Sequence, residues 1–135
     1  MTDEIIHRVI FDSTTKTSNS IGIMEEASIF LRCKMKNNLF KNIKAGIITP
    51  NYLADNRRVA LRWNKSTPVE RRWSKSTNSK ALFSNEPEIF INKLNAFDNL
   101  VVQWTPYSSH ARAVKFELTN VKKDIEKLKE VGCIF

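Results

Sequence analysis

The residues of this chain best suited to recognition are basic side chains that lie beside tryptophans in two short runs. The first run, RRVALRW, spans residues 57–63, and the second, RRWSK, spans residues 71–75. Planar guanidinium groups bind phosphate or carboxylate groups through two parallel hydrogen bonds, which favours an anionic partner. The candidate binding residues are Arg57, Arg58, Arg62, Arg71, Arg72 and Lys75.

The tryptophans leave two interpretations of this set open. An exposed ring beside the arginines would stack on a base or a sugar. In an extended strand, however, Trp63 shares a side with Val59 and Leu61, which favours a core position for its ring. Arg58 and Arg62 then point to solvent together, so the arginine surface is expected with or without a stacking ring.

The sequence offers little for catalysis. Its two histidines are His7, in an expected strand, and His110, in the polar loop SSHAR. A serine that neighbours a histidine in sequence is not a nucleophile–base pair, because the base must also be oriented by a third group. We find no nucleophile elbow, phosphate-binding loop or metal-protease motif. We therefore expect no enzymatic activity, catalytic residue, metal or cofactor.

The two cysteines, Cys33 and Cys133, allow two readings. Cys33 lies on the apolar side of an expected strand, and Cys133 follows the last expected helix. If that helix packs beside the strand, the thiols can form a disulfide, which requires an oxidising compartment. The alternative is two separate buried thiols that act as small apolar side chains. A zinc site would need four ligands, which these two residues do not supply.

Length and charge indicate a basic globular protein. The 135 residues suit one domain over residues 1–135, and a hydrophobic fraction of 41% argues against a disordered chain. The net charge is +8, and residues 32–80 hold thirteen basic residues but only two acidic ones. Such a segment favours nucleic acid, anionic lipid, a cell-wall polymer or an acidic protein as neighbour. The alternative is a lysine-rich solvated surface that keeps the protein soluble.

The sequence predicts no transmembrane segment, because no apolar run approaches the roughly 20 residues that span a bilayer. The N-terminus, MTDEIIHRVI, lacks the basic and apolar regions of a secretion signal. The chain is therefore expected to be a cytosolic protein or the mature form of an exported one.

Alternating apolar and polar residues predict many short strands. The clearest is Ser28–Lys36, in which odd-numbered residues are apolar and even-numbered ones are mostly charged, as in a sheet with one solvated face. Asn37-Asn38 follows it as an expected turn. Further strands are expected at 5–11, 20–25, 44–49, 57–63, 69–73, 80–84, 100–104 and 113–118.

Helical spacing appears only late in the chain. It predicts a helix over Glu86–Ala96, capped by Ser84 or Asn85, with Pro87 near its first position. A second helix is expected after a Thr119 or Asn120 cap and before Gly132. Its apolar stripe would comprise Val121, Ile125, Leu128 and Val131. The expected fold class is mainly β (α+β): an antiparallel twisted sheet or small β-sandwich with two short helices in the C-terminal half.

Several short segments follow one another in a distinctive order over about residues 28–135. They are LRCKMKNN at 31–38, VALRW at 59–63, WSKS at 73–76, TPY at 105–107, AVKFEL at 113–118 and the final Cys133. This order resembles the TagO family of periplasmic accessory proteins of type VI secretion. The resemblance implies a β-rich exported domain without an established catalytic site, and a pairing of Cys33 with Cys133. The chain departs from the family in its missing export signal and its strong basic charge, and such domains are also carried by phages or prophages.

Two functions follow from these observations. The first is a non-catalytic, TagO-like envelope accessory protein, periplasmic after removal of an export signal. It would use its basic surface on partner proteins or an anionic cell-wall component. The alternative is a cytoplasmic nucleic-acid-binding protein, or a phage-borne one that antagonises a host complex. The cysteine pair favours the first, and the signal-less start and the basic middle segment favour the second.

Overall fold

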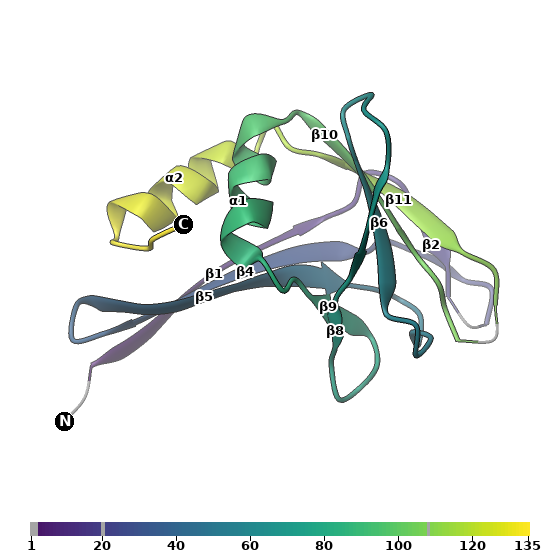
Figure 1. The fold of residues 1–135 in the computed structure, drawn as a ribbon, viewed down its shortest axis with the longest axis horizontal. Helices are drawn as coiled ribbons and strands as arrows, with labels where there is room; N and C mark the ends of the chain where they lie inside the picture. Colours follow the sequence, from purple (N-terminus) through teal and green to yellow (C-terminus); the bar gives the residue numbers. More distant parts are fainter. Residues whose placement is uncertain (1–2, 20, 108) are drawn as a thin grey trace.

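Antiparallel strands and two helices enclose one hydrophobic core in the computed structural model, which describes residues 3–19, 21–107 and 109–135 (Figure 1). A five-stranded sheet has the order β1 (Glu4–Asp12), β4 (Ser28–Lys36), β5 (Leu39–Ile48), β9 (Ala81–Phe83), β8 (Ser74–Lys75). A four-stranded sheet has the order β11 (Arg112–Glu117), β10 (Asn99–Trp104), β6 (Arg58–Trp63), β7 (Val69–Arg72). The helices are α1 (Pro87–Ala96) and α2 (Lys122–Glu130), and β2 (Thr17–Ser18) pairs with β3 (Met24–Glu25). The expected mainly β (α+β) fold class is confirmed.

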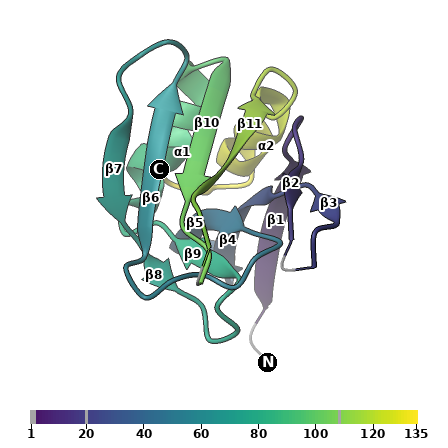
Figure 2. The same cartoon turned by 90° about the vertical axis from the view of Figure 1, so that its right-hand side faces the viewer.

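The helices and the four-stranded sheet lie on the same face of the five-stranded sheet. In Figure 1 they stand above the long strands β1, β4 and β5, and the strands of the second sheet cross those strands steeply. Figure 2 looks onto the outer face of the four-stranded sheet, with both helices behind it. Each sheet therefore has one face in the core and one face toward solvent.

The alternation predicted for Ser28–Lys36 is confirmed. The odd-numbered residues of β4 are 0–6% exposed and face the helices and the second sheet. The two residues that follow, Asn37 and Asn38, have φ angles of 52° and 61°, which suit the tight β4–β5 turn. One member of the opposite side, Phe30, is also buried, with only 7% of its surface exposed.

Two expected strands differ from the structure. Within the expected strand 20–25, only Met24–Glu25 is a strand, and residue 20 lies outside the described residues. The partner of this short strand is Thr17–Ser18. Asn19 Oδ1 accepts the backbone N–H groups of Ile21 and Ile23 and so stabilises the hairpin between them. The expected strand 69–73 ends at Arg72, because the buried Trp73 marks the point where the chain leaves one sheet for the other.

The predicted helix caps are wrong, although the helices themselves are present. Residues Glu86 and Val121 occupy the N-cap positions, and neither makes a side-chain capping hydrogen bond. Asn85 instead donates to the carbonyl oxygen of Arg72, which places it between strand and helix. Val131 is 44% exposed because α2 ends before it, whereas the other three members of the expected stripe are buried.

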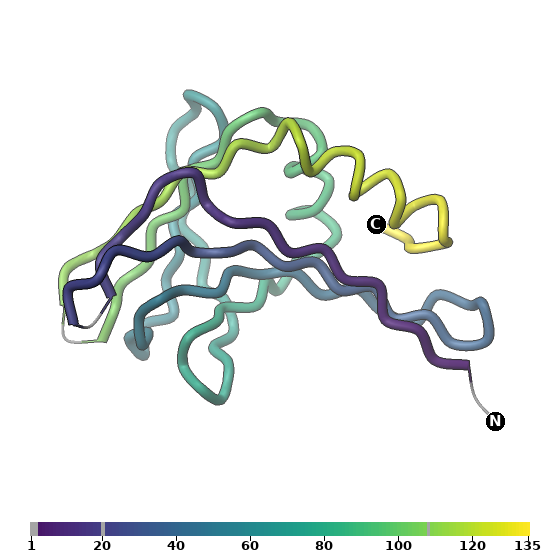
Figure 3. The backbone as a smooth tube through the Cα atoms, turned by 180° about the vertical axis from the view of Figure 1, so that it is seen from behind, coloured from purple at the N-terminus to yellow at the C-terminus, as the bar shows by residue number. Residues whose placement is uncertain are grey.

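The tail after α2 is bonded to β4 by a disulfide. Cys33 and Cys133 are 100 residues apart in sequence, their Cα atoms are 6.1 Å apart, and both side chains are buried. Gly132 turns the chain back with a φ of +109°, and a Cβ there would lie 3.0 Å from Met35 Cε. Figure 3 shows the final residues folding back beneath α2, close to the strands. The disulfide reading of the two cysteines is therefore confirmed.

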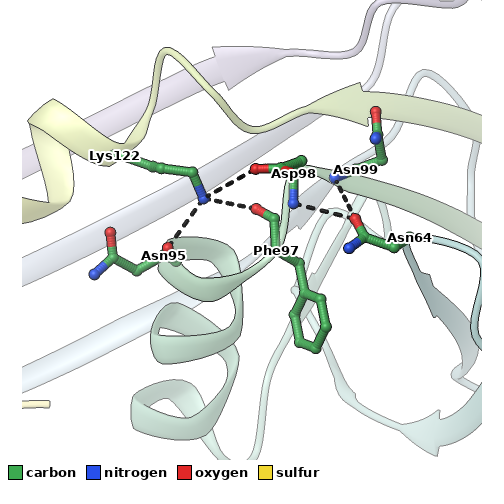
Figure 4. A network of polar contacts seen from close by, with 6 residues as sticks. All are labelled: Asn64, Asn95, Phe97, Asp98, Asn99 and Lys122. Atoms are coloured by element: carbon green, nitrogen blue, oxygen red, sulfur yellow. Dashed lines mark hydrogen bonds and ion pairs between the residues drawn. The ribbon is translucent and has the colours of Figure 1, made fainter.

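Lys122, at the start of α2, holds the end of α1 (Figure 4). Its Nζ donates hydrogen bonds to the carbonyl oxygens of Asn95 (3.0 Å) and Phe97 (2.7 Å) and lies 3.9 Å from Asp98 Oδ1. A cation at this position satisfies carbonyls that a helix leaves without partners and is favoured by the helix dipole. Asn64, in the β6–β7 turn, accepts the backbone N–H groups of Asp98 and Asn99 at 3.1 and 3.0 Å. The network joins both helices to the start of β10 and to the β6–β7 turn.

Replacing both cysteines, as Cys33→Ala with Cys133→Ala, should lower the free energy of unfolding by about 3–5 kcal/mol. The bridge restricts a denatured-state loop of about 100 residues, for which the chain-entropy model gives about 4.7 kcal/mol. Urea denaturation measures the loss, and reduction of the wild-type protein should produce a similar one. Two free thiols titrated in the unfolded, unreduced protein would contradict the bridge.

The Lys122→Met variant should lose about 1–2 kcal/mol of stability, because the carbonyls at the end of α1 lose a charged donor. Lys123→Met is the matched control, since this neighbouring side chain is exposed and has no ion-pair partner in the described part of the chain. Thermal and urea unfolding of both variants test the comparison. Equal losses in the two variants would show that the network contributes nothing specific.

Candidate anion-binding face

The register of β6 and β7 brings three of the predicted arginines together. Arg58 lies directly opposite Arg72, and Arg62 lies on the same side of β6 as Arg58. All three side chains are exposed on the outer face of the four-stranded sheet, the face that Figure 2 presents. The predicted solvent position of the arginines is therefore correct.

A fourth cation on this face was missed by the sequence analysis. Val101 of β10 lies opposite Arg62 on one side and opposite Lys115 of β11 on the other, so these three residues form one row across the sheet. Lys115 is exposed, and it belongs to the side of its strand that the alternation predicts to face solvent. The pairing of β11 with β10, which brings Lys115 into the row of Arg62, could not be predicted from the sequence. We call Arg58, Arg62, Arg72 and Lys115 the arginine face.

The centre of the arginine face is small and uncharged. Ala60, Val101, Gln103 and Ala113 fill the positions between the four cations. None of the four cations has an ion-pair partner within residues 3–19, 21–107 and 109–135. Two acids share the face: Glu70 lies opposite Ala60 and two residues from Arg72 on β7, and Glu117 lies two residues from Lys115 on β11. The face therefore keeps an excess of positive charge around small uncharged side chains.

Of the three other predicted binding residues, Arg71 lies at the edge of this face, and Arg57 and Lys75 lie elsewhere. Alternation places Arg71 on the opposite side of edge strand β7 from Arg72, and its Nη1 donates to the carbonyl oxygen of Glu70. Because β7 is at the edge of the sheet, Arg71 lines both a cleft of about 100 Å³ beside α1 and a hollow that Arg58 and Arg72 also line. Arg57 is half-buried in the turn before β6, with a φ of 53°. Lys75 lies on β8 in the other sheet.

The charge of Lys75 is already compensated. Its Nζ donates to Asp55 Oδ1 at 2.7 Å. This hydrogen bond, with the positive charges of Lys75 and Arg57, lowers the pKa of the Asp55 carboxyl below its ordinary value. Lys75 thus differs from the cations of the arginine face in two ways: it lies in the other sheet, and its charge is paired with that of Asp55.

The tryptophans of the two runs belong to the core. Trp63 and Trp73 are each 4% exposed. The Trp63 ring centre lies 5.8 Å from that of Phe90 and 5.6 Å from that of Phe97, and the Trp73 ring meets Phe90 edge-on at 5.2 Å. The predicted core position of Trp63 is correct, so neither ring is available to stack on a ligand at the arginine face.

Neither histidine contacts a catalytic constellation in the part of the chain that the structure describes. His7 is half-buried on β1, opposite Cys33. His110 is exposed, and its carbonyl oxygen accepts a hydrogen bond from Arg112, as does the Ser109 hydroxyl oxygen. Across residues 3–19, 21–107 and 109–135, no three His, Cys, Asp or Glu side chains are grouped so as to hold a metal ion.

Neither described helix has the length and apolar character to cross a bilayer.

Comparisons with models of protein families, with curated proteins and with solved structures found no match for this chain. Exposed guanidinium groups on a sheet face can bind carboxylate or phosphate groups through charge-assisted hydrogen bonds.

Because all three tryptophans are at most 4% exposed, their fluorescence should report the core and not the arginine face. We expect emission at shorter wavelength than in the unfolded protein and weak quenching by acrylamide. Adding poly-L-glutamate or an oligonucleotide should leave the emission unchanged. A strong quench by single-stranded DNA would place a tryptophan at the binding surface and contradict this assignment.

Proposed function

We propose that this protein is a non-catalytic envelope accessory protein of the TagO-like kind that its sequence resembles. It binds acidic groups of a partner protein, or of an anionic cell-wall polymer, with its arginine face. The observation that carries the proposal is the set of four exposed cations without ion-pair partners in the described residues, arranged around small uncharged side chains. The buried disulfide fits an exported protein, because disulfides persist in oxidising compartments.

The register suggests how the face selects an anion. Arg58 and Arg72 are direct cross-strand neighbours, and like charges in this relation repel each other. A carboxylate or phosphate placed between them accepts hydrogen bonds from both guanidinium groups and removes the repulsion. Arg62 and Lys115 lie two strands apart in another row, so a partner with several negative groups engages both rows at once. Such charge complementarity chiefly raises the association rate and the specificity.

Nucleic-acid binding by a cytoplasmic or phage-borne protein is the second candidate, since phosphates suit the same arginines. The buried tryptophans weigh against it, because proteins that bind single strands commonly stack bases on exposed rings. The disulfide also weighs against a reducing compartment. Both arguments favour an acidic protein or wall polymer as the partner.

The test compares two variants with equal net charge. Arg58→Gln, Arg62→Gln and Arg72→Gln together remove three charges from the arginine face and should weaken binding of poly-L-glutamate at low salt by at least tenfold. The control variant carries three substitutions outside that face, at exposed lysines: Lys41→Gln, Lys123→Gln and Lys127→Gln. It should bind nearly as the wild type does.

Equal weakening in both variants would overturn the proposal, because binding would then depend on net charge alone. A single-stranded oligonucleotide probes the second candidate. Tighter binding of DNA than of poly-L-glutamate, with a log–log salt slope of about −0.7 per phosphate contacted, would favour a nucleic-acid binder.

A further inference from the structure

A groove of about 340 Å³ lies on the face of the five-stranded sheet that points away from the helices. The β8–β9 connection, residues 76–80, forms one wall, and Figure 1 shows this loop hanging below the sheet on that side. The arginine face belongs to the other sheet, so the two surfaces share no residue. The volume falls within the range of roughly 300–1,000 Å³ typical of small-molecule sites.

The floor of the groove is made by two aromatic rings that meet over a glycine. Phe30 of β4, Gly46 of β5 and Phe83 of β9 occupy one row across the sheet. Since Gly46 has no side chain, the two rings pack edge to face with centres 5.3 Å apart. A Cβ at Gly46 would overlap the carbonyl oxygen of Leu82 and lie 3.0 Å from the Phe30 ring. The absence of a side chain at Gly46 therefore allows β9 to pair closely with β5 and allows the two rings to contact each other at the floor of the groove.

Apolar side chains extend the floor into solvent. Ile10 of β1, the next residue in the row of Phe30, is 60% exposed, and Ile48 is 40% exposed. Both line the groove. Exposed apolar side chains gathered in a concave surface mark binding sites more often than scattered ones do.

Two arginines stand at one end of this apolar floor. Arg8 and Arg32 are direct cross-strand neighbours in the row next to Ile10 and Phe30, and both line the groove. Neither has an ion-pair partner among the residues that the structure describes; the nearby acids of the same sheet face are otherwise engaged, Glu4 with Lys34 and Asp12 with Ser28. The repulsion between two adjacent guanidinium groups favours an anion between them.

The geometry points to a binding site for a free amphipathic organic anion. Its acidic group, a carboxylate or sulfonate, lies between Arg8 and Arg32. Its acyl or aromatic body lies on Phe30, Phe83 and Ile10 against the wall formed by residues 76–80. Neither a purely polar anion nor a neutral apolar molecule satisfies both parts of the groove. The site is independent of the function proposed for the arginine face.

The probe is 1-anilinonaphthalene-8-sulfonate, an aromatic sulfonate whose fluorescence rises in apolar surroundings. The folded wild-type protein should enhance it, and dodecanoate should displace it while dodecyltrimethylammonium should not. Arg8→Gln with Arg32→Gln should weaken probe binding at least tenfold, and Ile10→Gln should weaken it several-fold. Lys41→Gln with Lys123→Gln removes the same charge from exposed positions outside both the groove and the arginine face, and should leave probe binding unchanged.

Backbone amide shifts in NMR spectra locate the bound dodecanoate. Perturbations at Phe30, Gly46 and Phe83 are expected, and perturbations confined to other parts of the chain would overturn the assignment. Equal competition by the anionic and cationic surfactants would also overturn it. So would binding to phosphatidylglycerol vesicles without binding to monomeric dodecanoate, which would identify a membrane surface instead of a free ligand.

Discussion

The apolar side of β4 and β5 is the constraint on which the rest of the structure depends. Alternation places apolar residues on one side of a nine-residue strand about 30 Å long, which is longer than one short helix can cover. The four-stranded sheet covers one end, where Phe116 meets Phe11 edge-on at 5.8 Å. Helix α1 packs on β5, and the tail after α2 covers the other end, where the disulfide fixes it at Cys33. Three separate elements share one sheet face, so the chain can enclose a core with little helix.

Burying one face of each sheet leaves two broad solvent faces, and both carry cations that have no ion-pair partner among the described residues. Arg58 faces Arg72 in one sheet, and Arg8 faces Arg32 in the other. Such neighbours are unfavourable for folding, and a bound anion relieves the repulsion. The surroundings of the two pairs differ, since small uncharged residues surround the first and apolar side chains adjoin the second. The first arrangement suits a partner with several charges, whereas the second suits a small molecule with one.

Much of this architecture was predictable strand by strand. The two-residue alternation of side chains along a strand predicted which side each residue of Ser28–Lys36 lies on. It also predicted the core position of Trp63 and the solvent position of Arg58 and Arg62. The burial of Phe30 did not, because its cover comes from Phe83, more than fifty residues away in the chain. An aromatic residue on the charged side of a strand was the available signal for the groove. The resemblance to TagO proteins remains part of the proposed function.

The sequence by itself determined the features that depend on local geometry. They include the side on which each strand residue lies, the turn at Asn37-Asn38 and the return of the chain at Gly132, because backbone dihedral preferences and alternation act over a few residues. Only the tertiary structure decided that Lys115 lies in the same row as Arg62 and that Lys75 pairs with Asp55. The same is true of the contact between the Phe30 and Phe83 rings over Gly46. These contacts join residues far apart in the chain, so they follow from the order of the strands. That order is set by how all the apolar faces are buried together, which no single segment specifies.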